Sequence, residues 1–235
     1  MFKYNYNMSV FTNEDNISFY LLGAFITDGC VYKNNKNTYA CQLSSIDYEW
    51  LRKIADIIGQ NLKIHQFSKG YFGIRITRND ISQWFINRGC LPRKTYNVVL
   101  PDIPDQYFPD FIRGCIDGDG SIGTYYYKNN AKRVCQLISA SQIFLQQIQE
   151  KLKTKDIYST IVNRGKCNSV LNNKHIIAKT DSFSLVFNRY NCFKLLEMSY
   201  YNNHQISLNR KYLKAKEIID FYHNACNLSN LLNSS

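Results

Sequence analysis

Two aspartates occupy matching places in a segment that occurs twice in the chain. Asp28 lies near the end of residues 19–29 (FYLLGAFITDG), and Asp119 lies near the end of residues 111–120 (FIRGCIDGDG). Two carboxylates held close together repel each other unless a cation lies between or beside them, and hard oxygen ligands of this kind suit Mg²⁺. For a single copy, an Asp-Gly turn at a helix end explains the residues equally well. Two copies favour a shared metal site if the fold brings them together.

Each copy predicts a helix with a face of small residues. Gly23 and Gly114 occupy the same position of the two segments, and Thr27 and Gly118 follow one helical turn later, on the same face. A glycine inside a helix costs about 1 kcal/mol relative to alanine, so the glycines of the second copy indicate a packing requirement. If the two helices pack through these faces, the two aspartates lie side by side at one end of the pair.

The segments after the two helices repeat the same order of expected elements. Short runs rich in β-forming residues alternate with segments of helical periodicity. The first copy is expected to contain a helix through 19–26, strands 30–33 and 38–44, a helix at 46–58, strands 62–67 and 71–77, a helix at 79–87 and a basic loop at 91–95. The second is expected to contain a helix at 111–118, strands 121–127 and 132–138, a helix at 142–153, strands 157–162 and 183–187, and a helix at 192–198.

Short sequence matches support the repeat. Cys-Gln-Leu at 41–43 recurs at 135–137, and Arg93-Lys94 recurs as Arg210-Lys211. Matches at several separate places argue against chance similarity. We therefore expect an α+β fold of two pseudo-symmetric αββαββα repeats, residues 1–100 and 101–235. The second repeat adds an extended hairpin or loop at 163–180, a basic amphipathic helix at 208–221 and a loosely held tail at 224–235.

The composition bears on the class of binding partner and on the state of the cysteines. Lysine and arginine outnumber aspartate and glutamate by 29 to 18, a net charge of +11, which favours a polyanion such as nucleic acid. On charge alone, a soluble basic protein without such a partner fits equally well. The eight cysteines form no CxxC pair, so a zinc finger is disfavoured and reduced thiols are expected.

The chain has neither a signal peptide at its start nor an apolar run of the roughly 18 residues that a membrane span needs. We expect no membrane partner and an intracellular protein. An organelle matrix such as the mitochondrion and a phage or bacterial cytoplasm both remain open. The abundance of residues with AT-rich codons, such as Asn, Ile and Lys, is typical of such genomes.

The two motifs, LLGAFITDG at 21–29 and IRGCIDGDG at 112–120, resemble those of the LAGLIDADG homing endonucleases in their single-chain, two-repeat form. The resemblance covers residues 18 to about 221, and each motif is followed by the ββαββα series of that family. It implies a saddle-shaped, four-stranded antiparallel sheet in each repeat, with its concave face on duplex DNA. It also implies that the two motif helices form the interface and that the protein is a monomer.

The resemblance also implies a set of catalytic residues. Asp28 and Asp119 would hold Mg²⁺, for which Mn²⁺ or another divalent cation could substitute, and each would serve one strand of a double-strand cut by phosphodiester hydrolysis. Lys94 and Lys211 would lie near the cleavage centre, where a cation can stabilise phosphate charge. Asp117 stays outside the site, because the first repeat has Ile26 there. The candidates for ordering solvent are Ser44 or Ser45, and Ser139.

Base reading is expected from alternate strand residues that project into the major groove. For any one such residue, an ordinary solvated strand face is as good an explanation. Each repeat can follow about one helical turn, roughly 10 base pairs, so the DNA site should be long, and it should be asymmetric because the repeats have diverged. The candidates are Tyr32, Lys33, Gln42, Gln66, Arg75 and Thr77 in the first repeat, and Tyr125, Tyr127, Lys132, Arg133, Gln136 and Asn188 in the second.

Two other functions compete with the endonuclease. One is an RNA maturase that helps its host intron to splice; duplex RNA hides its major groove, so it would bind through other surfaces. The other is a catalytically silent DNA-binding protein, for which loss of Asp28 or Asp119 would be the expected sign. Both aspartates are present, which favours the nuclease without excluding a dual role. An intein is disfavoured because the terminal splicing residues are missing.

Overall fold

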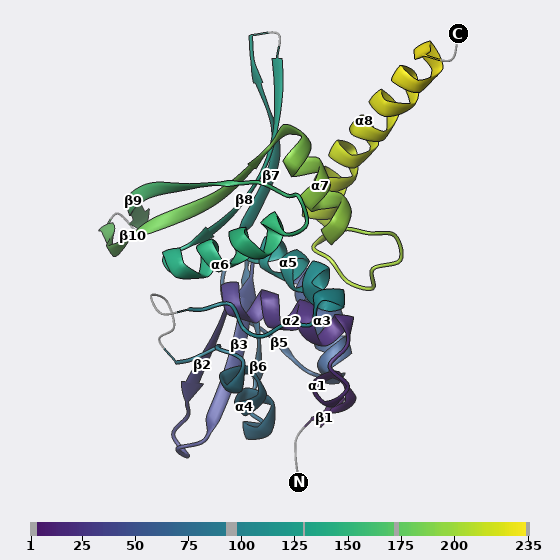
Figure 1. Cartoon of the computed structure of the whole chain (residues 1–235). Helices are drawn as coiled ribbons and strands as arrows, with labels where there is room; N and C mark the ends of the chain where they lie inside the picture. Colours follow the sequence, from purple (N-terminus) through teal and green to yellow (C-terminus); the bar gives the residue numbers. More distant parts are fainter. Residues whose placement is uncertain (1–3, 93–97, 129, 172–173, 234–235) are drawn as a thin grey trace.

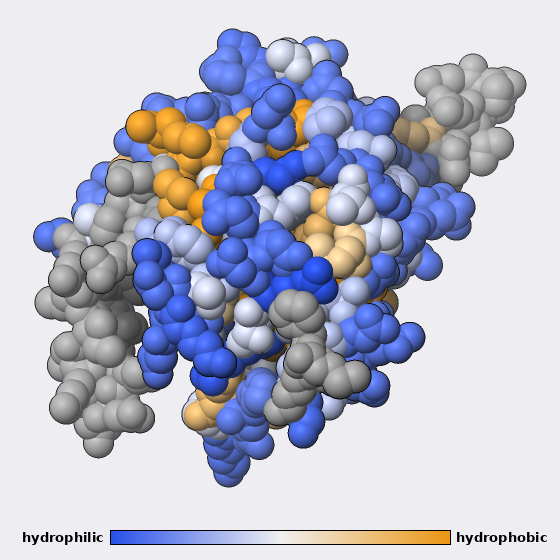
Figure 2. Space-filling view, turned by 90° about the horizontal axis from the view of Figure 1, so that it is seen from below, coloured by the Kyte–Doolittle hydropathy of each residue, from blue (hydrophilic) through white to orange (hydrophobic). Residues whose placement is uncertain are grey.

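The computed structural model describes residues 4–92, 98–128, 130–171 and 174–233. Within them the chain forms two four-stranded antiparallel sheets, with the helices α2 and α5 packed between the two halves (Figure 1). This is the α+β architecture of two αββαββα repeats expected from the sequence. Hydrophilic residues cover most of the face shown in Figure 2, and hydrophobic ones are limited to a few patches.

The first sheet has the strand order β2-β3-β6-β5, and a two-stranded ladder of β1 and β4 lies beside it. The elements are β1 (Asn5–Tyr6), α1 (Ser9–Thr12), α2 (Asn16–Thr27), β2 (Gly29–Lys33), β3 (Tyr39–Ser45), α3 (Tyr48–Ile58), β4 (Gly59–Gln60), β5 (Ile64–Ser68), β6 (Tyr71–Ile76) and α4 (Asn79–Asn87).

The second sheet repeats this order as β7-β8-β10-β9. Its elements are the short helix η2 (Asp105–Tyr107), α5 (Phe108–Asp117), β7 (Gly120–Tyr127), β8 (Asn130–Ser139), α6 (Gln142–Lys153), β9 (Thr160–Leu171), β10 (Lys174–Asn188), α7 (Arg189–Ser199) and α8 (Asn209–Asn233).

Local sequence explains where α2 begins and how it leads into β2. Asp15 caps the helix: its carboxylate accepts a hydrogen bond from the Ser18 amide at 3.0 Å, and the Ser18 hydroxyl accepts one from the Asp15 amide at 3.1 Å, a capping box. The chain enters β2 directly at Gly29, where a Cβ would lie 2.7 Å from the Phe25 Cα. The glycine of the Asp-Gly pair is therefore required because strand and helix come so close.

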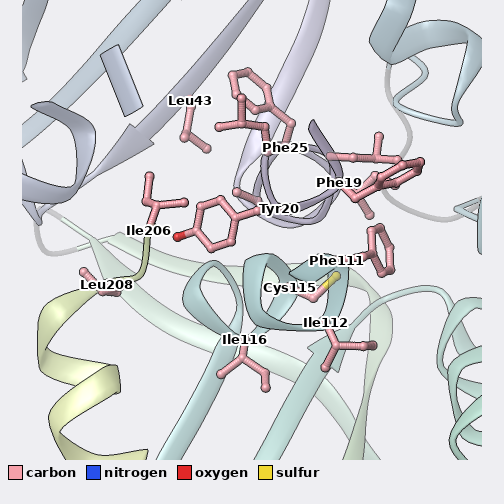
Figure 3. Packing of buried hydrophobic residues seen from close by; sticks show 14 of the residues in the cluster. Phe19, Tyr20, Phe25, Leu43, Phe111, Ile112, Cys115, Ile116, Ile206 and Leu208 are labelled. Atoms are coloured by element: carbon pink, nitrogen blue, oxygen red, sulfur yellow. The ribbon is translucent and has the colours of Figure 1, made fainter. Parts of the chain in front are cut away.

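The core is continuous across the two repeats. All residues of α2 from Ser18 to Ile26 are buried, so this helix has no solvated face, as expected for a helix covered on all sides. Figure 3 shows Phe19, Tyr20 and Phe25 of α2 above Phe111 and Cys115 of α5, with the two helices facing each other. The motif helices thus form the centre of the molecule.

Two parts of the second repeat are longer than expected. β9 and β10 extend across the 163–180 connection as one long hairpin. Of the two alternatives for that segment, an extended hairpin or a loop, the hairpin is therefore confirmed. α8 continues through Asn233, so the residues from 224 that were expected to form a loosely held tail are helical where the structure describes them. The first half of α8 packs through buried Ala215 and Ile218, and its far end projects from the body (Figure 1).

The basic loop expected at 91–95 lies partly outside the described residues, which omit 93–97. Within the described residues, none of the helices combines the length and the hydropathy that crossing a bilayer requires.

Candidate active site

The two motif helices touch backbone to backbone at Gly23 and Gly114. A Cβ added at Gly23 would overlap the Phe111 carbonyl oxygen and lie 2.9 Å from the Cys115 nitrogen. A Cβ added at Gly114 would meet the corresponding backbone atoms of Tyr20 and Ala24. The close packing expected from these glycines is confirmed, and the contact is symmetric.

The same contact continues to the last turn of both helices. A Cβ at Gly118 would overlap the Thr27 hydroxyl, and that hydroxyl donates back to the Gly23 carbonyl at 2.9 Å. The helices therefore remain together at their C-terminal ends. This brings Asp28 and Asp119, the next residues, to one end of the pair.

Asp28 and Asp119 are both exposed, and both act on one neighbouring cation. Asp28 caps α2, and its amide donates to the Ala24 carbonyl at 3.0 Å. The carboxylates of Asp28 and Asp119 both favour the charged form of Lys211, and Asp28 also helps to raise the pKa of Arg210. Because the helix ends pack together, both aspartates are expected to lie near the same cation.

This pair of carboxylates fits a hydrated divalent cation. Each lies where the negative end of a helix dipole also favours a cation. Among the described residues there is no cluster of three or more His, Cys, Asp or Glu side chains able to hold a metal. A metal at this place would take its remaining ligands from water and phosphate, which is how Mg²⁺ is usually bound.

A hollow of about 210 Å³ adjoins the Asp119 side of this site. Its wall includes Thr27 and Cys30 from the first repeat and Asp119 and Ser139 from the second. At about 30 Å³ per molecule, it has room for several waters. Ser139, a candidate for ordering solvent, lines this hollow, and its hydroxyl accepts a hydrogen bond from the Ser141 amide at 3.0 Å.

The other two serine candidates have different surroundings. The Ser44 hydroxyl accepts a hydrogen bond from the Gln42 side chain at 3.0 Å. Ser45 is buried, and its hydroxyl accepts from the Asp47 amide at 3.1 Å. Ser45 thus shapes the turn into α3.

Lys211 lies beside the aspartate pair but is only 3% exposed. Its ammonium donates to the carbonyls of Ile116, Asp117 and Gly118, each at 2.7 Å. An ammonium has three donors, so all of them are used to cap the C-terminal end of α5. Burial lowers the pKa of Lys211, and the nearby Asp117 opposes that shift. Its predicted partner in the first repeat, Lys94, lies outside the described residues.

Asp117 is buried and serves as an acceptor for three donors. The hydroxyls of Tyr20 and Tyr200 donate to it at 2.8 and 2.7 Å, and the Leu208 amide donates at 2.8 Å. Burial raises the pKa of Asp117 to about 6, and these hydrogen bonds oppose the rise. Trp50 of α3 donates to Tyr20 at 2.7 Å, so the network joins both repeats. This structural role fits the expectation that Asp117 lies outside the site.

A second buried charge on α5 holds the segment that leads to α8. Arg113 donates to the carbonyls of Ser199 at 2.8 Å and Ile206 at 2.9 Å, and to the Asp110 carboxylate at 2.7 Å. Figure 3 shows Ile206 beside the Tyr20 ring, with Leu208 further along the same segment, near the start of α8. The start of α8, with Arg210 and Lys211, is thereby fixed at the end of α5.

On the first sheet, strand pairing places Cys30, Gln42 and Arg75 in one row. Their neighbours in sequence are buried under the helices, so alternation turns this row to the open face. The Arg75 Nε donates to the Gln42 Oε1 at 2.9 Å. Tyr32 shares this face, and Thr77 lies one residue beyond β6.

By register, two first-repeat candidates fall on the opposite side of the sheet from this row, although both side chains are exposed. Lys33 pairs with Tyr39 and alternates with buried Val31. Gln66 pairs with Phe72, whose ring packs on Tyr48 of α3 at 5.2 Å. The sequence assigned both to the open face because the register of a short strand is invisible until its partner is known.

On the second sheet, Gln136 occupies the place that Gln42 has in the first. Its amide donates to the Ser121 hydroxyl at 2.8 Å, and its carbonyl accepts from Arg164 at 2.6 Å and from Ser184 at 3.1 Å. Other candidates on this face by register are Tyr125, Lys132 and Asn188, and the backbone of Tyr127 pairs with Asn130.

Two arginines of the second sheet have positions that the sequence did not predict. Arg133 was a DNA-reading candidate, but it lies on the opposite face of β8 from Gln136. Its guanidinium lies over the Phe221 ring of α8, 3.2 Å from the ring centroid. Arg164 was missed because the 163–180 connection had no assigned strands. Only the pairing of β9 with β10 brings it next to Gln136.

The family model described as "LAGLIDADG-like domain" matches residues 15–79 and 110–191, one region in each repeat and more than half of the chain. The chain belongs to the LAGLIDADG-like domain family. A search of curated protein sequences found no match.

Solved structures share the LAGLIDADG fold over nearly the full chain. The meganuclease I-SmaMI, bound to an uncleavable DNA, aligns with a TM-score of 0.58 at 12% identity, over 92% of this chain and 93% of that one. The LAGLIDADG homing endonuclease I-GzeII, in complex with its DNA target, aligns with a TM-score of 0.57 at 11% identity, over 91% and 92%. At this identity the likeness shows the fold, and the single-chain, two-repeat arrangement expected from the motifs is confirmed.

Proposed function

We propose that this protein is a site-specific endonuclease that cuts both strands of duplex DNA. The observation that carries the proposal is the meeting of Asp28 and Asp119 at one end of the α2–α5 contact. The open faces of two sheets flank this end, and the net charge of +11 suits a polyanion. Neighbours of the same fold are described as bound to DNA, one of them to cleaved DNA.

Asp28 and Asp119 hold divalent metal in this proposal, with Mg²⁺ as the natural ion and Mn²⁺ as a substitute. The bound metal supplies activation of water and neutralisation of charge on the phosphate. The chain's own part is to fix the carboxylates, and the glycine contact of α2 and α5 does so because neither backbone can shift independently. One neighbour of this fold is described with calcium ions and an uncleaved DNA target.

The DNA site is long and asymmetric in this proposal, and one chain binds it as a monomer inside the cell. The two sheets carry different residues at equivalent places: Arg75 holds Gln42 from β6, whereas Arg164 holds Gln136 from β9. Two different half-sites follow from two different reading surfaces.

The test uses purified protein with Mg²⁺ and a plasmid that carries the uninterrupted sequence of the gene's own insertion site. The wild type should make a double-strand cut. Asp28→Asn and Asp119→Asn should bind this DNA but not cut it, because each removes one carboxylate from the metal site. Asp56→Asn is a matched control, since Asp56 is an exposed carboxylate on α3 in a surface pair with Arg52.

Cutting that survives both single substitutions would remove the proposed site. Binding of the plasmid without cutting by the wild type would instead favour a silent DNA-binding protein. Faster splicing of the host intron RNA without DNA cutting would favour the maturase.

A further inference from the structure

The Arg-Lys pair at the start of α8 divides its two charges between different tasks. Lys211 is buried and uses its ammonium on three backbone carbonyls of α5. An ammonium in that state has no N–H left for a phosphate oxygen. The preceding residue, Arg210, has a side chain that is 52% exposed.

Arg210 is held by an aspartate of the other repeat. Its Nε donates to the Asp47 Oδ1 at 3.0 Å, and its Nη2 donates to the Asp47 Oδ2 at 3.0 Å. This two-pronged pair occupies one edge of the planar guanidinium. Within the described part of the chain, Nη1 has no hydrogen-bond acceptor, and the side chain is half exposed, so the opposite edge of the guanidinium is accessible.

Asp47 is itself well anchored. It is the residue before α3, its amide donates to Ser45 at 3.1 Å, and its side chain is 19% exposed. It therefore limits the rotation of a side chain that would otherwise be mobile. Hydrogen bonding to Asp47 raises the pKa of Arg210, and Asp117 and Asp28 add to that effect, so the guanidinium lies within the field of Asp28.

We propose that Arg210, and not Lys211, is the cation that contacts a DNA phosphate beside the aspartate pair, and that Lys211 is a positioning residue that holds the last turn of α5 and thus Asp119. The proposal rests on the proposed function. A guanidinium matches the geometry of phosphate oxygens and stays charged, so the outward edge of Arg210 suits this role. Asp47 pre-orients it from the other repeat.

Two measurements on Arg210→Ala test the proposal. Affinity for the duplex is measured against salt concentration in EDTA, without cutting, and the cleavage rate is measured in a single turnover with Mg²⁺. Loss of one phosphate contact should lower the salt slope by about 0.9. Cleavage should fall on the order of 100-fold, as for the loss of one donor to a transition state. Arg210→Lys should keep the slope and restore only part of the rate.

Lys211→Met supplies the contrasting result. It should lower the melting temperature and slow cleavage, because three buried carbonyls lose their donor, yet leave the salt slope unchanged. If Lys211→Met does not fold, Lys211→Arg takes its place, and Arg210→Ala alone still decides the first half of the proposal. Arg52→Ala is the matched control, because Arg52 is also paired with an aspartate but lies on α3.

An unchanged slope and rate for Arg210→Ala, or a lowered slope for Lys211→Met, would overturn the proposal. The slope needs no catalysis, so a wild type that binds DNA without cutting it would refute the endonuclease and still test the Arg210 contact.

Discussion

At the scale of residues, three aspartates near the ends of α2 and α5 have different fates because their surroundings differ. Asp28 and Asp119 are exposed at the helix ends, where a cation can reach them. Asp117 is 1% exposed and accepts three hydrogen bonds. The same carboxylate group is thus a proposed metal ligand in two cases and a structural acceptor in the third.

We predict that Asp117→Asn lowers the free energy of unfolding by about 1–3 kcal/mol, the usual cost of leaving buried hydrogen-bonding groups unsatisfied. An amide offers one oxygen where three donors converge, and its NH₂ opposes one of them. Urea denaturation followed by fluorescence measures the change. Asp56→Asn, on the surface, should change stability by less than about 1 kcal/mol. Equal effects for the two variants would mean that the Asp117 network contributes nothing.

At the scale of elements, the crossing of α2 and α5 sets the geometry of the site. Glycine at 23 and 114 allows the two backbones to touch, and this contact leaves no room for a methyl group on either side. The buried charges Arg113 and Lys211 then attach the start of α8 to α5. Each connection fixes the position of a residue at the helix ends.

Gly114→Ala should destabilise the protein by about 1–3 kcal/mol or more, because overpacking a rigid backbone contact forces the helices apart. The cleavage rate of the remaining folded protein should fall as well, since Asp28 and Asp119 move with their helices. Thermal unfolding and single-turnover cleavage measure the two effects. Gly123→Ala is the control: its Cβ would lie 3.5 Å from the Tyr125 ring, an ordinary contact. A Gly114→Ala protein as stable as the wild type would contradict the close approach.

At the scale of the whole molecule, the two sheets and the central helices form one body with an open face. Ties between the repeats include Asp47 with Arg210 and Ser141 with the Val98 carbonyl, at 2.6 Å. Each links the residue before the middle helix of one repeat to the other part of the chain. The open rows around Gln42 and Gln136 then lie on a common support.

DNA bound across this face should protect Cys30 from alkylation, because Cys30 is exposed and pairs with Gln42 in the open row. Cys226 is exposed on α8 and should react at the same rate with and without DNA. Burial raises the pKa of Cys192 to about 12, so this thiol should stay unreactive near pH 8 until the protein unfolds. Mass spectrometry of the labelled peptides measures all three. Equal labelling of Cys30 with and without DNA would place the DNA elsewhere.

The sequence by itself determined the two-repeat plan and the order of the main elements, and it put Asp28 and Asp119 at equivalent helix ends. These follow from local patterns: small residues at helical spacing, alternating strands, and a repeat that gives each pattern twice. The expected αββαββα series needed no knowledge of long-range contacts.

Only the tertiary structure decided which charged residues face solvent and which are buried. Arg133 packs under α8, Arg164 meets Gln136 across a hairpin, and Lys211 caps α5 while Arg210 points outward. The sequence could not distinguish these roles, because the residue type of a lysine or arginine does not reveal whether its side chain is buried or exposed. Its role depends on strand register and on neighbours that are distant in the chain, and both exist only once the repeats have packed together.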